Sequence, residues 1–151
     1  MNYRKILGCM ALCICYVAKS NAQHIPPVNQ APTFKPALFN QFPLKTECRL
    51  GELEKLFAAK GKISASVASE LSLRGEVIAN VKQNPSVNTI NIRLSDFPGA
   101  MFTLSRIRLE DGTIRYNGHI ISRDHSDALV LSIENGKYYF TKEEQRLVVT
   151  E

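Results

Sequence analysis

The chain has 151 residues, a formal net charge of +5, four cysteines and 44% hydrophobic residues, which suits a single globular domain. The basic charge and the cysteines first suggest a nucleic-acid binder or a disulfide framework. Both features depend on the first 22 residues, and removing these leaves 16 basic and 14 acidic residues with one cysteine, which disfavours both classes.

Residues 1–22 have the three-part layout of a secretory signal peptide. Arg4 and Lys5 form a positive end, residues 6–18 are an apolar run, and Ser20 and Ala22 are the small residues expected before a cleavage site. The run is too short to anchor the protein in a bilayer. We therefore expect cleavage before residue 23, a secreted or periplasmic protein, and no stable membrane anchor.

Residues 23–45 form a proline-rich arm. Five of the seven prolines lie there, and such dense proline favours an extended path with few backbone donors. Phe34, Leu38, Phe39 and Phe42 lie among the prolines. Two interpretations remain open: a disordered arm, or an arm whose phenylalanines pack on a partner or along the domain. We favour an arm that is partly ordered only when bound.

Residues 46–151 are predicted to form a β-rich domain that begins with one helix over residues 46–60. Thr46 can cap this helix, Leu50, Leu53 and Leu56 recur at helical spacing, and Gly61 follows as a stop signal.

From residue 62 the apolar period changes to two, which predicts β-strands. The predicted strands cover residues 63–73, 77–81, 90–94, 101–109, 113–121, 128–133, 137–141 and 146–150. Asn135-Gly136 is the strongest hairpin signal among the turns between them. The predicted fold is mostly β (α+β), an antiparallel sandwich or curled meander with one N-terminal helix.

Two histidines near two aspartates are the best candidate metal ligands. His119 and His125 lie close in sequence to Asp124 and Asp127, whereas a metal site needs three or four converging ligands. The sequence carries no HExxH, CxxC or EF-hand pattern. We interpret these residues as polar groups around a turn and predict no metal and no cofactor.

Cys48 could pair with a histidine as a nucleophile, but Glu47 and Glu52 lie nearby and would raise the pKa of its thiol. A buried structural cysteine, an intermolecular disulfide and a reactive ligand all remain open, and we favour the first. Without a GxSxG or glycine-rich phosphate motif, we predict no catalytic residues and a protein that is not an enzyme.

A predicted central hairpin carries Arg106, Arg108 and Arg115, and strand alternation could place some of these arginines on one face to bind an acidic partner. Tyr138 and Tyr139 lie on a predicted sheet edge and are further candidate contacts. The alternative is that these residues form a solvent-exposed face of the sheet that binds nothing. Few aromatic residues and a nearly neutral mature charge argue against nucleic acid.

Three short segments carry a pattern typical of one protein family. Residues 116–120 read YNGHI, residues 126–132 read SDALVLS and residues 136–140 read GKYYF. This pattern resembles the prodomain of secreted reprolysin-like zinc metalloproteases. The resemblance implies a β-rich domain that lies against a protease and assists its folding or blocks its cleft. Cys48 lies far upstream of the family's latency cysteine, so we expect a free-standing relative of the prodomain.

The predicted function is an exported, non-enzymatic protein-binding domain, an inhibitor or folding partner of a secreted protease. The alternative is an envelope structural or adhesion-type β module that binds glycan or a surface protein. A metal-dependent hydrolase using His119 and His125 is the third and least favoured hypothesis.

Overall fold

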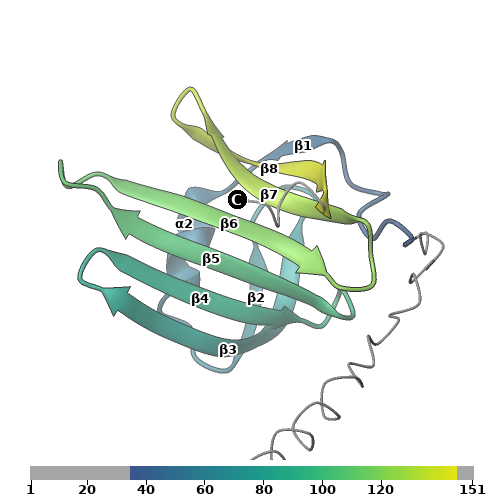
Figure 1. Ribbon diagram of the computed structural model, residues 1–151, viewed down its shortest axis with the longest axis horizontal. Helices are drawn as coiled ribbons and strands as arrows, with labels where there is room; N and C mark the ends of the chain where they lie inside the picture. Colours follow the sequence, from purple (N-terminus) through teal and green to yellow (C-terminus); the bar gives the residue numbers. More distant parts are fainter. Residues whose placement is uncertain (1–34, 146–151) are drawn as a thin grey trace, which may run out of the picture. The chain divides into compact units, whose positions relative to one another are not determined.

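The computed structural model describes residues 35–145, which form one short helix and one antiparallel sheet of eight strands (Figure 1). The elements follow in chain order: β1 (Lys45–Glu47), α2 (Leu50–Leu56), β2 (Lys62–Ser66), β3 (Ser72–Asn84), β4 (Val87–Leu94), β5 (Ala100–Arg108), β6 (Ile114–Ser122), β7 (Asp127–Glu134) and β8 (Lys137–Glu144). Within this described part, no helix is long and apolar enough to cross a membrane. The predicted signal peptide and the predicted strand at residues 146–150 lie outside it.

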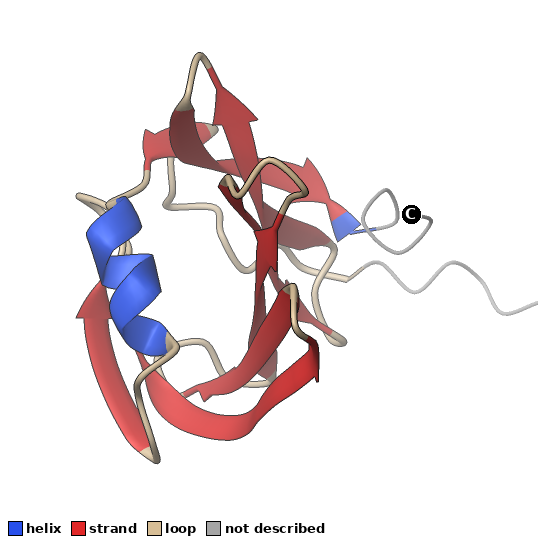
Figure 2. Ribbon diagram, turned by 90° about the vertical axis from the view of Figure 1, so that its left-hand side faces the viewer, coloured by secondary structure: helices blue, strands red, loops and turns tan. Residues whose placement is uncertain are grey.

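The sheet is a curled meander with the strand order β1-β8-β7-β6-β5-β4-β3-β2 (Figure 2). Its edges meet at one point, where Cys48 and Ala68 form a bridge and the Arg49 N–H donates to the Val67 carbonyl at 2.7 Å. The prediction of a mostly β, antiparallel fold is therefore confirmed, and the meander describes it better than the sandwich.

Helix α2 is shorter than the predicted helix over residues 46–60. Residues 45–47 pair with β8 instead, and the Cys48 N–H donates to the Tyr138 carbonyl at 2.8 Å, so the backbone there is extended. Thr46 therefore lies outside the helix, and the N-cap residue is Arg49, whose side chain makes no capping hydrogen bond. The predicted pattern holds for Leu53 and Leu56, which are both buried.

The core lies on the concave side of the sheet. Every second side chain of each strand points to this side, because successive side chains of a strand lie on opposite faces. Fully buried residues from the central strands fill it: Ile90, Ile92, Phe102, Leu104, Ile120, Leu129 and Phe140. Each such side chain contributes about 1.5–3 kcal/mol through removal of apolar surface from water.

Partway along β3, the side chains that point to the concave side switch from odd-numbered to even-numbered residues. A β-bulge between Val77 and Ala79 shifts the pairing, so that Val77 pairs with Ile92 but Asn80 pairs with Ile90. One extra residue in a strand moves every later side chain to the opposite face. Asn80 and Lys82 therefore face the concave side, and a second register shift between Lys82 and Asn84 ends this arrangement.

The second half of the proline-rich arm belongs to the folded domain. Phe39 is fully buried, and its ring contacts those of Phe42 and Phe97 at centroid distances of 5.9 and 5.4 Å. The N–H groups of Leu38 and Phe39 donate to the Asp127 carboxylate at 2.6 and 2.8 Å. The described arm thus follows the alternative in which its phenylalanines pack along the domain, without a partner being needed to order it.

The Asn135-Gly136 hairpin is confirmed. Asn135 has φ of 50° and Gly136 has φ of 77°, the positive values that a two-residue turn of this kind needs. The turn joins β7 to β8 in an unbroken register from Glu134–Lys137 to Asp127–Glu144.

Candidate functional site

Strand β5 changes from apolar to basic along its concave face. Phe102 and Leu104 are fully buried there, and Arg106 and Arg108 follow at the same alternation. The two arginines pair in register with Tyr116 and Ile114 of β6, and both are exposed. They therefore lie where the core ends and solvent begins.

Lys82 joins the two arginines because of the bulge in β3. After the bulge, Lys82 pairs with Asn88 of β4, and Asn88 pairs with Arg106 of β5. Register pairs lie on the same face of a sheet. Strict alternation through Val77 would put Lys82 on the other face, which is why the sequence pattern does not bring it to the site.

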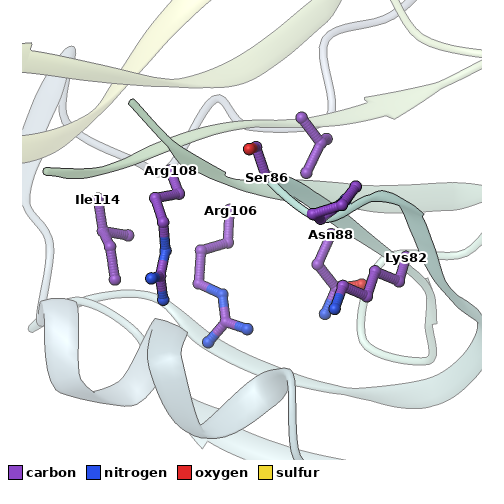
Figure 3. Close-up of a pocket in the computed structure, with 8 residues that line it drawn as sticks. Lys82, Ser86, Asn88, Arg106, Arg108 and Ile114 are labelled. Carbon is purple, nitrogen blue, oxygen red and sulfur yellow. The ribbon is translucent and has the colours of Figure 1, made fainter. Parts of the chain in front are cut away.

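These residues surround a hollow of about 170 Å³, which we call the basic hollow (Figure 3). Its lining is Lys82, Pro85, Ser86, Val87, Asn88, Arg106, Arg108 and Ile114. Figure 3 shows the Arg106 and Arg108 side chains extending in the same direction from β5. The lining holds three cationic side chains and no carboxylate, so its charge is entirely positive.

No ion pair within residues 35–145 involves Lys82, Arg106 or Arg108. The pairs found there lie elsewhere: Lys45–Glu134, Lys55–Glu52, Arg74–Asp96 and Lys137–Glu47. Arg106 instead places its Cζ atom 5.2 Å from the centroid of the Phe57 ring, a cation–π contact that fixes the side chain but leaves its charge available.

Tyr116 forms the inner boundary of this region. Its hydroxyl donates to Glu54 Oε1 at 3.1 Å. Burial first, and then the hydrogen bond and negative charge of Glu54, raise the pKa of Tyr116 to about 12. The hydroxyl is therefore neutral at physiological pH, and its hydrogen bond engages the carboxylate of Glu54 in helix α2.

Asn88 carries an unusual polar atom in the wall of the basic hollow. Its Oδ1 is buried and accepts no hydrogen bond from any residue in the described part of the chain. An unsatisfied buried acceptor costs about 1–3 kcal/mol. The hollow therefore combines positive charge with one acceptor that lacks a donor.

The five residues singled out by the sequence do not form one surface. Arg106 and Arg108 line the basic hollow, whereas Arg115 pairs with Ile107 and lies on the opposite, convex face. Tyr138 is only 7% exposed, and its hydroxyl accepts the Tyr116 N–H at 3.1 Å, so it is a core residue. Tyr139 lies on the convex face, with Lys45 Nζ 4.3 Å from its ring centroid.

The candidate metal ligands do not converge. Burial lowers the pKa of His119, which projects from β6. His125 uses its Nδ1 in a 2.8 Å hydrogen bond with Ser122 Oγ, while Asp127 holds the arm. Residues 35–145 contain no group of three histidines, cysteines or acidic residues that could hold a metal ion.

Cys48 is 8% exposed and belongs to the core, next to the point where the sheet edges meet. Burial raises the pKa of its thiol to about 12. This cause differs from the acidic neighbours that the sequence suggested, although the direction is the same. The thiol is protonated at physiological pH, as expected for a structural cysteine.

Comparison with known proteins adds no relative. No protein-family model, no curated protein and no solved structure matches the chain. The resemblance to a metalloprotease prodomain therefore stays a prediction, and the candidate site is defined by the geometry of the basic hollow.

Proposed function

We propose that the mature chain is an exported, non-enzymatic domain that binds a protein partner at the basic hollow. One observation carries this proposal: Lys82, Arg106 and Arg108 surround one hollow and form no ion pair within residues 35–145. Arginine is enriched at protein interfaces, and unpaired charge of one sign steers a partner of opposite charge.

The position of these cations favours binding over a purely solubilising role. Arg106 and Arg108 stand on β5 in the middle of the sheet, with pairing strands on both sides. Side chains on such a backbone lose less freedom on binding than side chains on a loop. A surface charge that only keeps a protein soluble has no need for this rigid support.

A secreted protease is the partner class that we favour, with the domain acting as its inhibitor or folding partner. The support is the resemblance of residues 116–120, 126–132 and 136–140 to the metalloprotease prodomain. In this proposal Cys48 does not block a catalytic zinc, because its thiol is buried in the core. The basic hollow is the contact instead.

Site-specific photo-crosslinking tests the proposal. A photoreactive residue is placed at Ser86, which lines the basic hollow, or at Asn117, which lies exposed on the convex face of β6. Each mature protein is incubated with the native secretome, and crosslinked proteins are identified by mass spectrometry. We expect one protein to crosslink at Ser86 and not at Asn117.

Crosslinking at Asn117 alone would contradict the proposal and favour an envelope or adhesion-type module. The convex face has hydroxyl and amide groups that suit such a role. Thr89 Oγ1 lies 2.8 Å from Ser105 Oγ, and the Thr103 hydroxyl donates to Asn91 Oδ1 at 2.9 Å. Polar rows of this kind can bind glycan, so the two outcomes separate the two functions.

A further inference from the structure

We infer that the basic hollow recognises an extended acidic peptide segment, with carboxylates bound by Arg106 and Arg108 and a backbone N–H donated to Asn88 Oδ1. This inference rests on the proposed function, since it names the chemistry of the partner at the same site.

The spacing of the two arginines matches an extended peptide. Arg106 and Arg108 are alternate residues of one strand, so their backbone positions lie roughly 6.5–7 Å apart. An extended peptide places its own alternate side chains at the same interval. Acidic residues at positions i and i+2 can therefore meet both guanidinium groups, each in the two-pronged geometry that suits a carboxylate.

The Asn88 acceptor adds a requirement that negative charge alone does not meet. Its Oδ1 is buried and has no donor in the described residues, so a ligand meets it only when the amide side chain turns toward the hollow; a carboxylate or an inorganic anion offers no donor at all. A peptide supplies a backbone N–H between its side chains. Ile114 is 41% exposed at the same hollow and offers apolar contact to the stem of an acidic side chain.

Nucleic acid is a poorer match for the same positive charge. Proteins that bind single strands stack bases on open aromatic rings. No aromatic residue lines the basic hollow, and the Phe57 ring beside it is already occupied by Arg106. The charge pattern therefore favours a ligand that needs hydrogen bonds and ion pairs without stacking.

Peptide titration tests the inference directly. The probe is a fluorescent peptide with the sequence Ser-Glu-Ser-Glu-Ser-Glu-Ser, and its counterpart has glutamine at each glutamate. Binding to the mature protein is followed by fluorescence anisotropy at low and high salt. We expect only the glutamate peptide to bind, with an affinity that falls as salt rises.

The chain provides a matched control for the arginines. The double variant Arg106→Gln/Arg108→Gln should weaken peptide binding about tenfold or more, as expected for the loss of two charge-assisted contacts. Arg115→Gln removes one positive charge on the neighbouring strand but on the convex face, and it is compared with the single variants Arg106→Gln and Arg108→Gln as well as with the double variant; it should change affinity less than about twofold. Circular dichroism and melting curves confirm that the variants are folded.

Asn88 gives a second, independent arm of the test. Asn88→Asp places a negative charge beside the bound carboxylates, so it should abolish binding of the glutamate peptide. Asn88→Ala removes the whole amide, acceptor and NH₂ group together, without adding charge, and should weaken binding by less than Asn88→Asp.

Several results would overturn the inference. These are no binding at about 1 mM peptide, equal affinity for the glutamine peptide, equal losses in Arg115→Gln and in the double variant, or preference for a sulfated oligosaccharide or an oligonucleotide. If the native partner still crosslinks at Ser86 while the peptide fails, the proposed function stands and only this inference falls. If neither binds, both fall.

Discussion

The two ends of the curled sheet are finished in opposite ways. At the end where β5 begins, the arm and the preceding loop bring the rings of Phe39, Phe42 and Phe97 together. At the end where β5 finishes, Arg106 and Arg108 surround a hollow without ion-pair partners in the described residues. One end is closed by apolar burial, and the other is left open and charged.

The difference indicates which end serves stability and which serves binding. The arm end satisfies its polar groups, because Asp127 accepts two backbone N–H groups beside the buried rings. At the hollow, the three cations have no ion-pair partner and Asn88 Oδ1 has no hydrogen-bond donor in the described residues, so apart from the contact of Arg106 with the Phe57 ring these groups add little to folding. If this comparison is right, substitutions at the two ends should have separable effects on stability and on binding.

The largest expected effect is at the arm end. Phe39→Ala removes a fully buried ring from the aromatic cluster and should lower the free energy of unfolding by about 3–5 kcal/mol, measured by urea denaturation. Leu44→Ala is the control, because Leu44 is 73% exposed in the same segment and should change stability by less than about 0.5 kcal/mol. Equal losses in both variants would show that Phe39 does not close the core.

Asp127→Asn tests the attachment of the arm by its hydrogen bonds. Asparagine presents one oxygen and one NH₂ group to the two N–H donors of Leu38 and Phe39, so one donor is left facing another. We expect the free energy of unfolding to fall by about 1.5–3 kcal/mol, with faster chymotryptic cleavage after Phe39, which is buried in the wild type. Asp124→Asn, on the exposed neighbouring loop, should leave both measurements unchanged.

Cys48 lies at the seam between the sheet edges and gives a pH-dependent test. The folded thiol has a pKa of about 12 against 9.0 for its ordinary value. Its contribution is therefore complete below about pH 8.5 and falls from pH 9 upward, by up to about 1.4 kcal/mol per pH unit, as the unfolded thiol ionises first. Tyr116 adds a similar loss only above about pH 10.

Cys48→Ser should lower the free energy of unfolding by about 1–2 kcal/mol at neutral pH. It should also flatten the dependence of that free energy on pH between pH 9 and 10, since serine does not titrate there. Partner binding at the basic hollow should be unchanged. If the free energy of unfolding of the variant still falls with pH as steeply as that of the wild type, the Cys48 thiol is not the group that causes the fall. Rapid thiol labelling of the native protein would contradict its burial.

The local sequence pattern was enough to predict most strands of the sheet, but not the pairing between segments that are far apart in the chain. Alternating apolar residues and Asn135-Gly136 predict most of the strands and a hairpin correctly, because both signals depend only on near neighbours. The predicted strand over residues 63–73 is wrong, since residues 67–71 connect β2 to β3, and residues 77–81 are part of β3. The start of helix α2 could not be predicted, since residues 45–47 are held extended by β8, which lies far along the chain.

The candidate site was half predictable for a related reason. Arg106 and Arg108 follow from alternation within one strand. Lys82 does not, because the bulge in β3 reverses which face it occupies and a bulge has no strong local signal here. Asn88 was missed because the predicted strand begins at residue 90, whereas β4 begins at Val87. Arg115 shares the predicted hairpin but lies on the other face, which strand alternation could indicate only once the core face was known.

The smallest expected effect is at the hollow, and its sign decides the comparison. Arg108→Gln removes one of three like charges that have no ion-pair partner in the described residues, so stability should rise by a few tenths of a kcal/mol (about 0.2–0.5) in low salt and return to the wild-type value in high salt. Arg115→Gln should show no such gain, because Arg115 lies near Asp111, whose pKa is lowered chiefly by hydrogen bonds from Thr113 and to a smaller extent by the charge of Arg115, which is favourable there. Urea denaturation at two salt concentrations measures both variants. A salt-independent loss above about 1 kcal/mol in Arg108→Gln would mean that this arginine supports the fold, and the open end could no longer be contrasted with the closed one.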